Sequence, residues 1–163
     1  MICGVIAAPS PVRHGSSCIS GETGVTRSFQ RKWLFFTSLL VGSFGPVFFL
    51  GTMGPTLEPA RLSLDILSWP IDGNITLAAS ETRFLSALTG GFLFGWGVMI
   101  FCLARWVYDL APDQVRRCVV TGLCAWFVLD SAGSVASGHP SNALFNVIVL
   151  LLAVGPLWWP ARN

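Results

Sequence analysis

Asp130 is the residue of this sequence that most needs a chemical explanation, because it is the one charged side chain in the apolar stretch 118–136. An ionised carboxylate at the centre of a lipid bilayer costs roughly 2.5–3.5 kcal/mol on insertion scales. Such residues therefore usually face the protein interior, where they are paired and often serve a function. The sequence marks Asp130 as the first candidate for binding or proton transfer.

Other polar side chains are expected to lie near Asp130. A second apolar stretch, 141–159, follows after a turn at residues 138–140. At a rise of about 1.5 Å per residue, Asp130 lies about 12 Å before this turn and Asn146 about 9 Å after it. The two side chains are then at similar depth in adjacent helices. We predict a polar cluster that opens toward the outer side and contains Arg83, Asp130, Ser134, His139, Asn142 and Asn146.

Two interpretations of this cluster stay open. Arg83 begins the second apolar stretch and is the expected counter-ion of Asp130. The functional hypothesis is a small binding pocket or a proton-accepting site. The structural alternative is that the pair locks the helices together and that Asp130 lies near enough to the surface to stay hydrated. A folded Asp130→Asn variant that loses binding favours the first interpretation, and an unfolded one favours the second.

The sequence gives no sign of other catalytic chemistry. Its five cysteines form no CxxC pair, so no metal site is predicted. The two histidines, His14 in the N-terminal stretch and His139 in a turn, are poorly placed to bind haem. A net charge of +2 without a basic run argues against a nucleic-acid partner. We predict no cofactor, and the absence of catalytic motifs favours a protein that is not an enzyme.

The composition indicates which elements position these residues. Hydrophobic residues make up 53% of the 163 residues and charged residues only 11%, whereas soluble domains carry about 25% charged residues. A membrane-spanning helix needs roughly 20 apolar residues. Four stretches meet this length, at 33–52, 84–104, 118–136 and 141–159. We predict an all-α integral membrane four-helix bundle over residues 27–163.

The positions of the basic residues predict the orientation. Two of the ten Lys and Arg, Arg61 and Arg83, lie between the first and second stretches. The other eight fall on the opposite side: Arg13, Arg27, Arg31, Lys32, Arg105, Arg116, Arg117 and Arg162. Because basic residues favour the cytoplasmic side, both termini are predicted to be cytoplasmic.

The sequence also predicts the structure of two regions outside the spans, the N-terminal stretch and the long outer loop. Residues 1–26 are rich in Ser, Gly and Pro without a sustained period, which predicts a disordered tail or an over-extended start with translation beginning near Val25. The long outer loop, about 51–82, is apolar enough to cap the bundle or rest on the membrane. Its periodicity does not choose between strand and helix, and Asp72-Gly73 indicates a turn, with a small hairpin as one interpretation.

Helix ends and a packing face can also be predicted. Ser80 and Ser141 are candidate N-caps, and Pro112 marks a helix start. Small residues recur every four positions in the second stretch, which allows another helix to approach closely. The partner is either another span of the chain or a second copy, unless the spacing has no special role. These residues are Ala87, Gly91 and Gly95.

Several of these features together resemble a known group. They are Glu81-Thr82-Arg83 through Gly90-Gly91, then Gly95 and Gly97, then Asp130 to Gly133, and Gly138-His139-Pro140. Over residues 30–159 the chain resembles small, uncharacterised four-helix bacterial membrane proteins, broadly of the DoxX-like type. The resemblance implies a four-helix bundle in a prokaryotic inner membrane and no particular activity. That group commonly has Arg where this chain has Asp130, so no site is carried over.

Three functional hypotheses follow. The first is a non-enzymatic accessory subunit or small-ligand binder. The second is an oligomeric small transporter or proton-coupled component that uses Asp130, and it requires a stable multimer because four helices are few for a transporter. The third is a membrane redox accessory that receives its cofactor from a partner. The expected partners are the lipid bilayer and either a second copy of the chain or a larger membrane complex.

Overall fold

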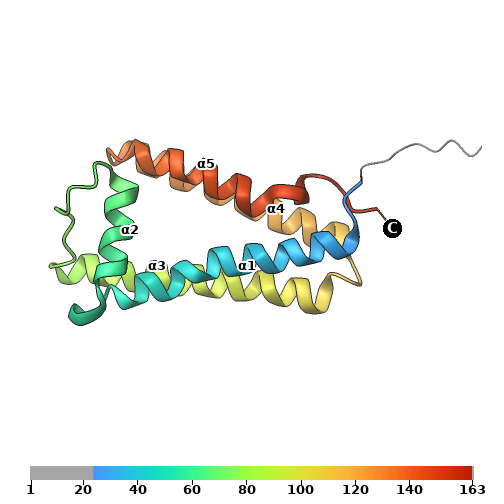
Figure 1. Ribbon diagram of the computed structural model, residues 1–163, viewed down its shortest axis with the longest axis horizontal. Helices are drawn as coiled ribbons and strands as arrows, with labels where there is room; N and C mark the ends of the chain where they lie inside the picture. Colours follow the sequence, from blue (N-terminus) through green and yellow to red (C-terminus); the bar gives the residue numbers. More distant parts are fainter. Residues whose placement is uncertain (1–23, 163) are drawn as a thin grey trace, which may run out of the picture.

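The computed structural model describes residues 24–162, and these residues form helices and connecting turns without a strand (Figure 1). Predictions for residues 1–23 lie outside the described residues. The five α-helices are α1 (Arg27–Leu50), α2 (Glu58–Ser68), α3 (Ser80–Cys102), α4 (Pro112–Ala136) and α5 (Pro140–Val154). A π-helical turn, Leu103–Val107, continues α3, and 3₁₀ turns occupy Gly54–Thr56 and Gly155–Trp158.

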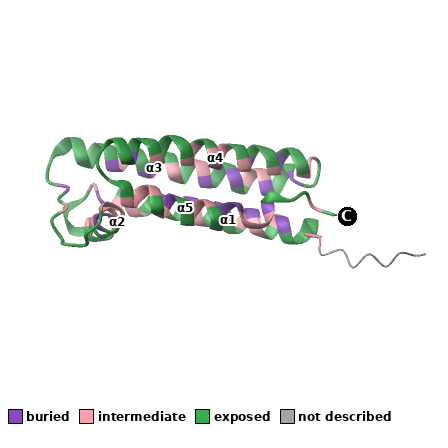
Figure 2. Cartoon of the chain, turned by 90° about the horizontal axis from the view of Figure 1, so that it is seen from above, coloured by how far each residue is buried: buried purple, intermediate pink, exposed green. Residues whose placement is uncertain are grey.

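Four of these helical segments are long and apolar enough to cross a membrane, as predicted. They are Arg27–Leu50, Ser80–Val107, Pro112–Ala136 and Pro140–Trp158. Only 11% to 33% of the residues in the most apolar part of each helix are buried within the chain, and exposed residues follow the outside of the helices in Figure 2. An exterior this apolar requires an apolar surrounding, such as lipid.

The helices start earlier than the apolar stretches because helix ends are set by caps rather than by hydropathy. Thr26 caps α1, and its Oγ1 accepts the Phe29 N–H at 3.3 Å. Both α4 and α5 begin with proline, which has no N–H to leave unsatisfied at this position. The predicted N-caps Ser80 and Ser141 are wrong. The N-cap residues are Ala79 and His139, so both serines lie within the first turn.

The bundle consists of two helix pairs. Figure 1 shows α1 lying along α3 and α4 along α5, with α2 crossing between the pairs at one end. The described ends of the chain meet at the opposite end, where the Arg162 N–H donates to the Val25 carbonyl at 2.9 Å. We call these two ends the α2 end and the terminal end.

Glycines allow α1 and α3 to approach closely. A Cβ on Gly97 would lie 2.5 Å from the Gly42 Cα, and one on Gly90 would lie 2.7 Å from the Gly45 oxygen. Neither position has room for a larger side chain. The packing face of α3 within the chain is therefore this one.

The predicted face of Ala87, Gly91 and Gly95 does not make this approach. A Cβ on Gly91 or Gly95 would meet nothing within 4 Å. The reason is rotational, since Gly90 and Gly97 point toward α1 and the neighbouring positions are turned away from it. For residues 24–162, the prediction that this ridge packs against another span is wrong, and a second copy stays a prediction.

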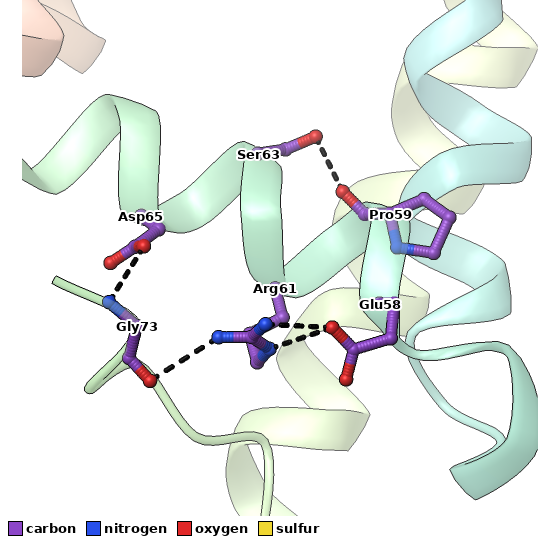
Figure 3. Close-up of polar contacts among 6 residues, drawn as sticks. All are labelled: Glu58, Pro59, Arg61, Ser63, Asp65 and Gly73. Carbon is purple, nitrogen blue, oxygen red and sulfur yellow. Dashed lines mark hydrogen bonds and ion pairs between the residues drawn. The ribbon is translucent and has the colours of Figure 1, made fainter. Parts of the chain in front are cut away.

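The outer loop contains a helix and, after it, a connecting segment of residues 69–79 that we call the strap. Residues 58–68 form α2, which settles the ambiguous periodicity in favour of a helix. The turn at Asp72-Gly73 is present, with a φ of 72° at Gly73, but residues 69–79 form no hairpin. Figure 3 shows that side chains of α2 bind both backbone groups of Gly73, since its N–H donates to Asp65 Oδ2 at 3.0 Å and its carbonyl accepts from Arg61 at 3.2 Å.

Candidate ligand-binding cavity

A cavity of about 590 Å³ lies at the α2 end of the bundle. Pockets for small molecules commonly measure about 300–1,000 Å³ and are mostly apolar with a few polar groups. This cavity has the same character. Its lining residues come from α1 to α5 and the strap: Val41, Phe44, Phe48, Leu64, Leu67, Ser68, Asn74, Ile75, Thr76, Leu77, Thr82, Leu85, Ser86, Thr89, Leu93, Trp96, Leu123, Trp126, Asp130, Asn142, Phe145, Asn146 and Val149.

Helical periodicity explains why these side chains share the cavity. On α4 the lining residues are Leu123, Trp126 and Asp130, at intervals of three and four. On α5 the interval from Asn142 to Asn146 is four. Residues three and four apart lie on one helix face, so each helix presents one stripe to the cavity.

The polar wall is built around the Asp130 carboxylate. Its Oδ2 accepts the Asn142 amide at 3.0 Å and the Asn146 amide at 2.6 Å. The Asn142 amide also donates to Ser134 Oγ at 2.7 Å, and that hydroxyl donates to the Asp130 backbone carbonyl at 2.7 Å. The structure thus brings together four of the predicted residues. The short turn at 138–140 sets their register, since it makes α4 and α5 antiparallel neighbours.

The other two predicted residues lie elsewhere. Arg83 does not neutralise Asp130, and neither residue takes part in an ion pair within residues 24–162. Arg83 instead borders a second cavity of about 400 Å³ beside Arg61. The physical reason is that α3 packs along α1 rather than α4, so the start of α3 does not reach Asp130. His139 is exposed in the turn, where its Nδ1 lies 3.4 Å from Ser137 Oγ.

Counting donors and acceptors shows which hydrogen bonds the side chains around Asp130 can still form. An ionised carboxylate only accepts, so both asparagines present their NH₂ groups to it. This leaves three acceptor oxygens without a donor among residues 24–162: Asp130 Oδ1, Asn142 Oδ1 and Asn146 Oδ1. The polar wall is therefore rich in unused acceptors.

Aromatic and aliphatic side chains form the rest of the wall. The rings of Trp96 and Trp126 meet edge to face, with centroids 6.2 Å apart and planes at 63°. Phe44 and Phe48 contribute from α1, and Phe145 from α5. Sequence reasoning did not identify these residues. The aromatic at position 126, one turn before Asp130, was the available signal, because it places an indole on the same helix face as the carboxylate.

A roof made of α2 and the strap covers the α2 end. Ser141 Oγ at the start of α5 donates to the Leu67 carbonyl of α2 at 2.5 Å. Arg61 and Glu58 form an ion pair at 2.7 Å, and the Arg61 hydrogen bond lowers the pKa of the Glu58 carboxyl. The hydrogen bonds from Asn74 likewise lower the pKa of Asp72 in the strap. The roof is thus held by contacts to α5 and within itself.

No group of three or more His, Cys, Asp or Glu within residues 24–162 is arranged to hold a metal ion. No known protein family, curated protein or solved structure matches this chain. The resemblance to DoxX-like proteins therefore stays a prediction, and the function has to be argued from the cavity itself.

Proposed function

We propose that this chain is a non-enzymatic membrane protein that binds a small amphipathic molecule in the cavity between its two helix pairs. The observation that carries the proposal is the combination of a 590 Å³ apolar cavity and the Asp130 carboxylate in its wall. The apolar wall favours the body of such a molecule through the hydrophobic effect. The Asp130, Asn142 and Asn146 side chains orient its polar end.

The proposal includes a location in the bacterial inner membrane with both termini in the cytoplasm. In support, the described termini lie at one end of the bundle, where Arg31 pairs with Asp109 at 2.8 Å and Arg116 donates to the Leu157 carbonyl at 3.1 Å. Basic residues favour the cytoplasmic side. The cavity then lies in the outer half of the membrane, with α2 at the outer surface.

A variant whose side chain fills the cavity tests the proposal. Thr89 lines the cavity, and the neighbouring Leu88 is exposed and does not line it. Thr89→Phe places a ring in the cavity, whereas Leu88→Phe adds the same ring on another face of α3. Native mass spectrometry after mild solubilisation measures molecules that copurify. We expect a reproducible small-molecule adduct in the wild type and in Leu88→Phe, and its loss in Thr89→Phe. An adduct that survives in a folded Thr89→Phe contradicts the proposed site.

Asp130 also favours a second candidate function, a proton-coupled transporter. A carboxylate within a membrane cavity is the kind of group that relays protons. This function requires an oligomer, so the same native spectra test it. A wild-type protein that stays monomeric at every detergent and protein concentration contradicts the transporter and leaves the ligand binder standing.

A further inference from the structure

The cavity wall carries one formal charge, and it is negative. Among its lining residues within 24–162, Asp130 is the only ionisable side chain, and none is Lys, Arg or His. The Asp130 carboxylate has amide hydrogen bonds but no cationic partner in this part of the chain. Asp130 is exposed within the described residues, so a bound cation can reach it, and a ligand that buries this charge has to bring an opposite one, because an unpaired buried charge is costly. The missing counter-ion is the first indication of what the cavity binds.

The hydrogen-bond inventory selects the same kind of ligand. Within residues 24–162, the unused side-chain groups on the α4 and α5 side of the cavity are the acceptors Asp130 Oδ1, Asn142 Oδ1 and Asn146 Oδ1. Lining hydroxyls without a partner in the same residue range belong to α2, the strap and α3, at Ser68, Thr76 and Thr89. A primary ammonium has three N–H donors and no acceptor. An alcohol offers one donor, and a carboxylate or phosphate offers none while repelling Asp130. Of these head groups, the primary ammonium matches the wall in both charge and donor number.

The aromatic residues support a cationic head group as well. Trp126 lies one helical turn before Asp130 on the same face of α4, and its ring meets that of Trp96. Phe145 lines the cavity directly before Asn146 on α5. Cations are attracted to aromatic faces, most strongly to Trp. The rest of the wall is aliphatic and aromatic, which suits an alkyl or aryl body.

We infer that the ligand is an amphipathic primary ammonium ion, with its head group at Asp130, Asn142 and Asn146 and its apolar body between Phe44, Trp96 and Trp126. This inference rests on the proposed ligand-binding function. It names the ligand class that the cavity takes, and it assigns Asp130 the role of counter-ion for the ligand rather than for another residue of the chain.

A matched ligand series tests the inference on the wild-type protein. 4-Phenylbutylammonium, 4-phenylbutanol and 4-phenylbutanoate share one apolar body and differ in the charge and donors of the head group. Isothermal titration calorimetry measures their binding to the full chain in phosphatidylcholine nanodiscs, with empty nanodiscs as the blank. We expect the ammonium to bind about tenfold or more tightly than the alcohol, because hydrogen bonds to charged groups are the stronger ones. We expect no binding of the carboxylate above the blank.

Charge variants separate the role of Asp130 from general attraction of cations. Asp130→Asn removes the charge at nearly constant shape, and Glu81→Gln removes the same charge from an exposed position outside the cavity lining. We expect Asp130→Asn to lower ammonium affinity about tenfold or more while leaving alcohol affinity unchanged. Glu81→Gln should change neither. The ligand series alone still decides the inference if Asp130→Asn does not fold.

The outcomes distinguish this inference from the proposed function. If the alcohol or the carboxylate binds as tightly as the ammonium, and Thr89→Phe abolishes that binding, the cavity binds ligands but the cation inference is overturned. The cation inference is also overturned if a folded Asp130→Asn retains full ammonium affinity. If no member of the series binds above the blank and Thr89→Phe changes no copurified mass, both the inference and the proposed function fail.

Discussion

The two ends of the bundle are built from the same helices but differ in how their polar groups are satisfied. At the terminal end, Tyr108 is 2% exposed and donates to Gln30 Oε1 at 2.9 Å, and the Gln30 amide donates to the Trp159 carbonyl at 2.5 Å. At the α2 end, the Asp130 cluster borders a cavity and keeps unused acceptors. The buried Tyr108–Gln30 pair closes its hydrogen bonds within the chain, although Arg116 Nε at the same end has no hydrogen-bond partner among residues 24–162. The α2 end has room for a ligand.

Packing accounts for this difference. The larger buried cluster lies toward the terminal end and includes Leu34, Ala104, Val154 and Leu157, so the helix pairs meet there through well-fitted apolar side chains. A smaller cluster of Phe48, Ala60 and Leu77 joins α1 to the roof instead. Because α2 inserts between the pairs at that end (Figure 1), the pairs meet the roof rather than each other. The terminal end is thus closely packed, whereas the α2 end contains the cavity.

Five predictions test this comparison, ranked by the expected loss of unfolding free energy. The largest effect should come from Gly97→Leu, in the α1–α3 contact shared by both ends. Its Cβ would lie 2.5 Å from the Gly42 Cα, so we expect a loss of about 3 kcal/mol or more, at the upper end of overpacking effects. Gly91→Leu is the matched control, since that position has nothing within 4 Å. Unfolding in sodium dodecyl sulfate measures both, and equal stability would contradict the assigned packing face.

Tyr108→Phe should weaken the terminal end. The change removes the donor to Gln30 Oε1 and leaves a buried acceptor unsatisfied, at a cost of about 1–3 kcal/mol. Trp106→Phe, at a position 65% exposed, is the control and should cost less. Ligand affinity should be unchanged in both variants. A Tyr108→Phe protein that loses ligand affinity but no stability would reverse the roles of the two ends.

Ser141→Ala should loosen the roof without unfolding the bundle. It removes the hydrogen bond to the Leu67 carbonyl, worth about 0.5–1.5 kcal/mol. We expect faster hydrogen exchange in α2 and faster ligand dissociation. Ser43→Ala is the control, because Ser43 bonds only within α1, at the Leu40 carbonyl. Unchanged exchange in α2 would show that this contact does not hold the roof.

Asp130→Asn should cost little stability although it lowers the affinity for an ammonium ligand. Asp130 is exposed and no cation of residues 24–162 pairs with its carboxylate, so neutralising it breaks no ion pair. We expect a change within about 1 kcal/mol of wild type, of either sign. A loss as large as that of Tyr108→Phe, in the same sodium dodecyl sulfate measurement, would favour the structural interpretation, in which Asp130 locks α4 to α5.

The smallest effect should be a pH dependence confined to the roof. The partners Arg61 and Asn74 lower the pKa values of Glu58 and Asp72 below their ordinary 4.5 and 3.8. A lowered pKa in the folded state stabilises the fold above the unfolded pKa, and this contribution is lost as the pH falls through the folded value. Hydrogen-exchange protection factors of residues 58–79 should therefore decrease below about pH 4. Glu58→Gln should reduce that decrease, and an identical pH profile in this variant would contradict the assignment.

Part of the candidate site could be predicted from the sequence because it depends on a local connection. Asp130, Asn142 and Asn146 belong to consecutive helices joined by a turn, so counting residues from the turn gives their relative depth. The place of Arg83 could not be obtained in this way. Arg83 follows a long outer segment, and its distance from Asp130 depends on which helices pack together.

The sequence alone determined the four apolar helices and the register of the α4–α5 hairpin, because hydropathy and helix rise act within a short length of chain. Only the tertiary structure decided which glycines of α3 face α1, where α2 lies and how large the cavity is. These features depend on the rotation of each helix about its own axis and on contacts between segments far apart in the chain. Small shifts in either of these move a residue from one face to another, as the neighbouring positions Gly90 and Gly91 illustrate.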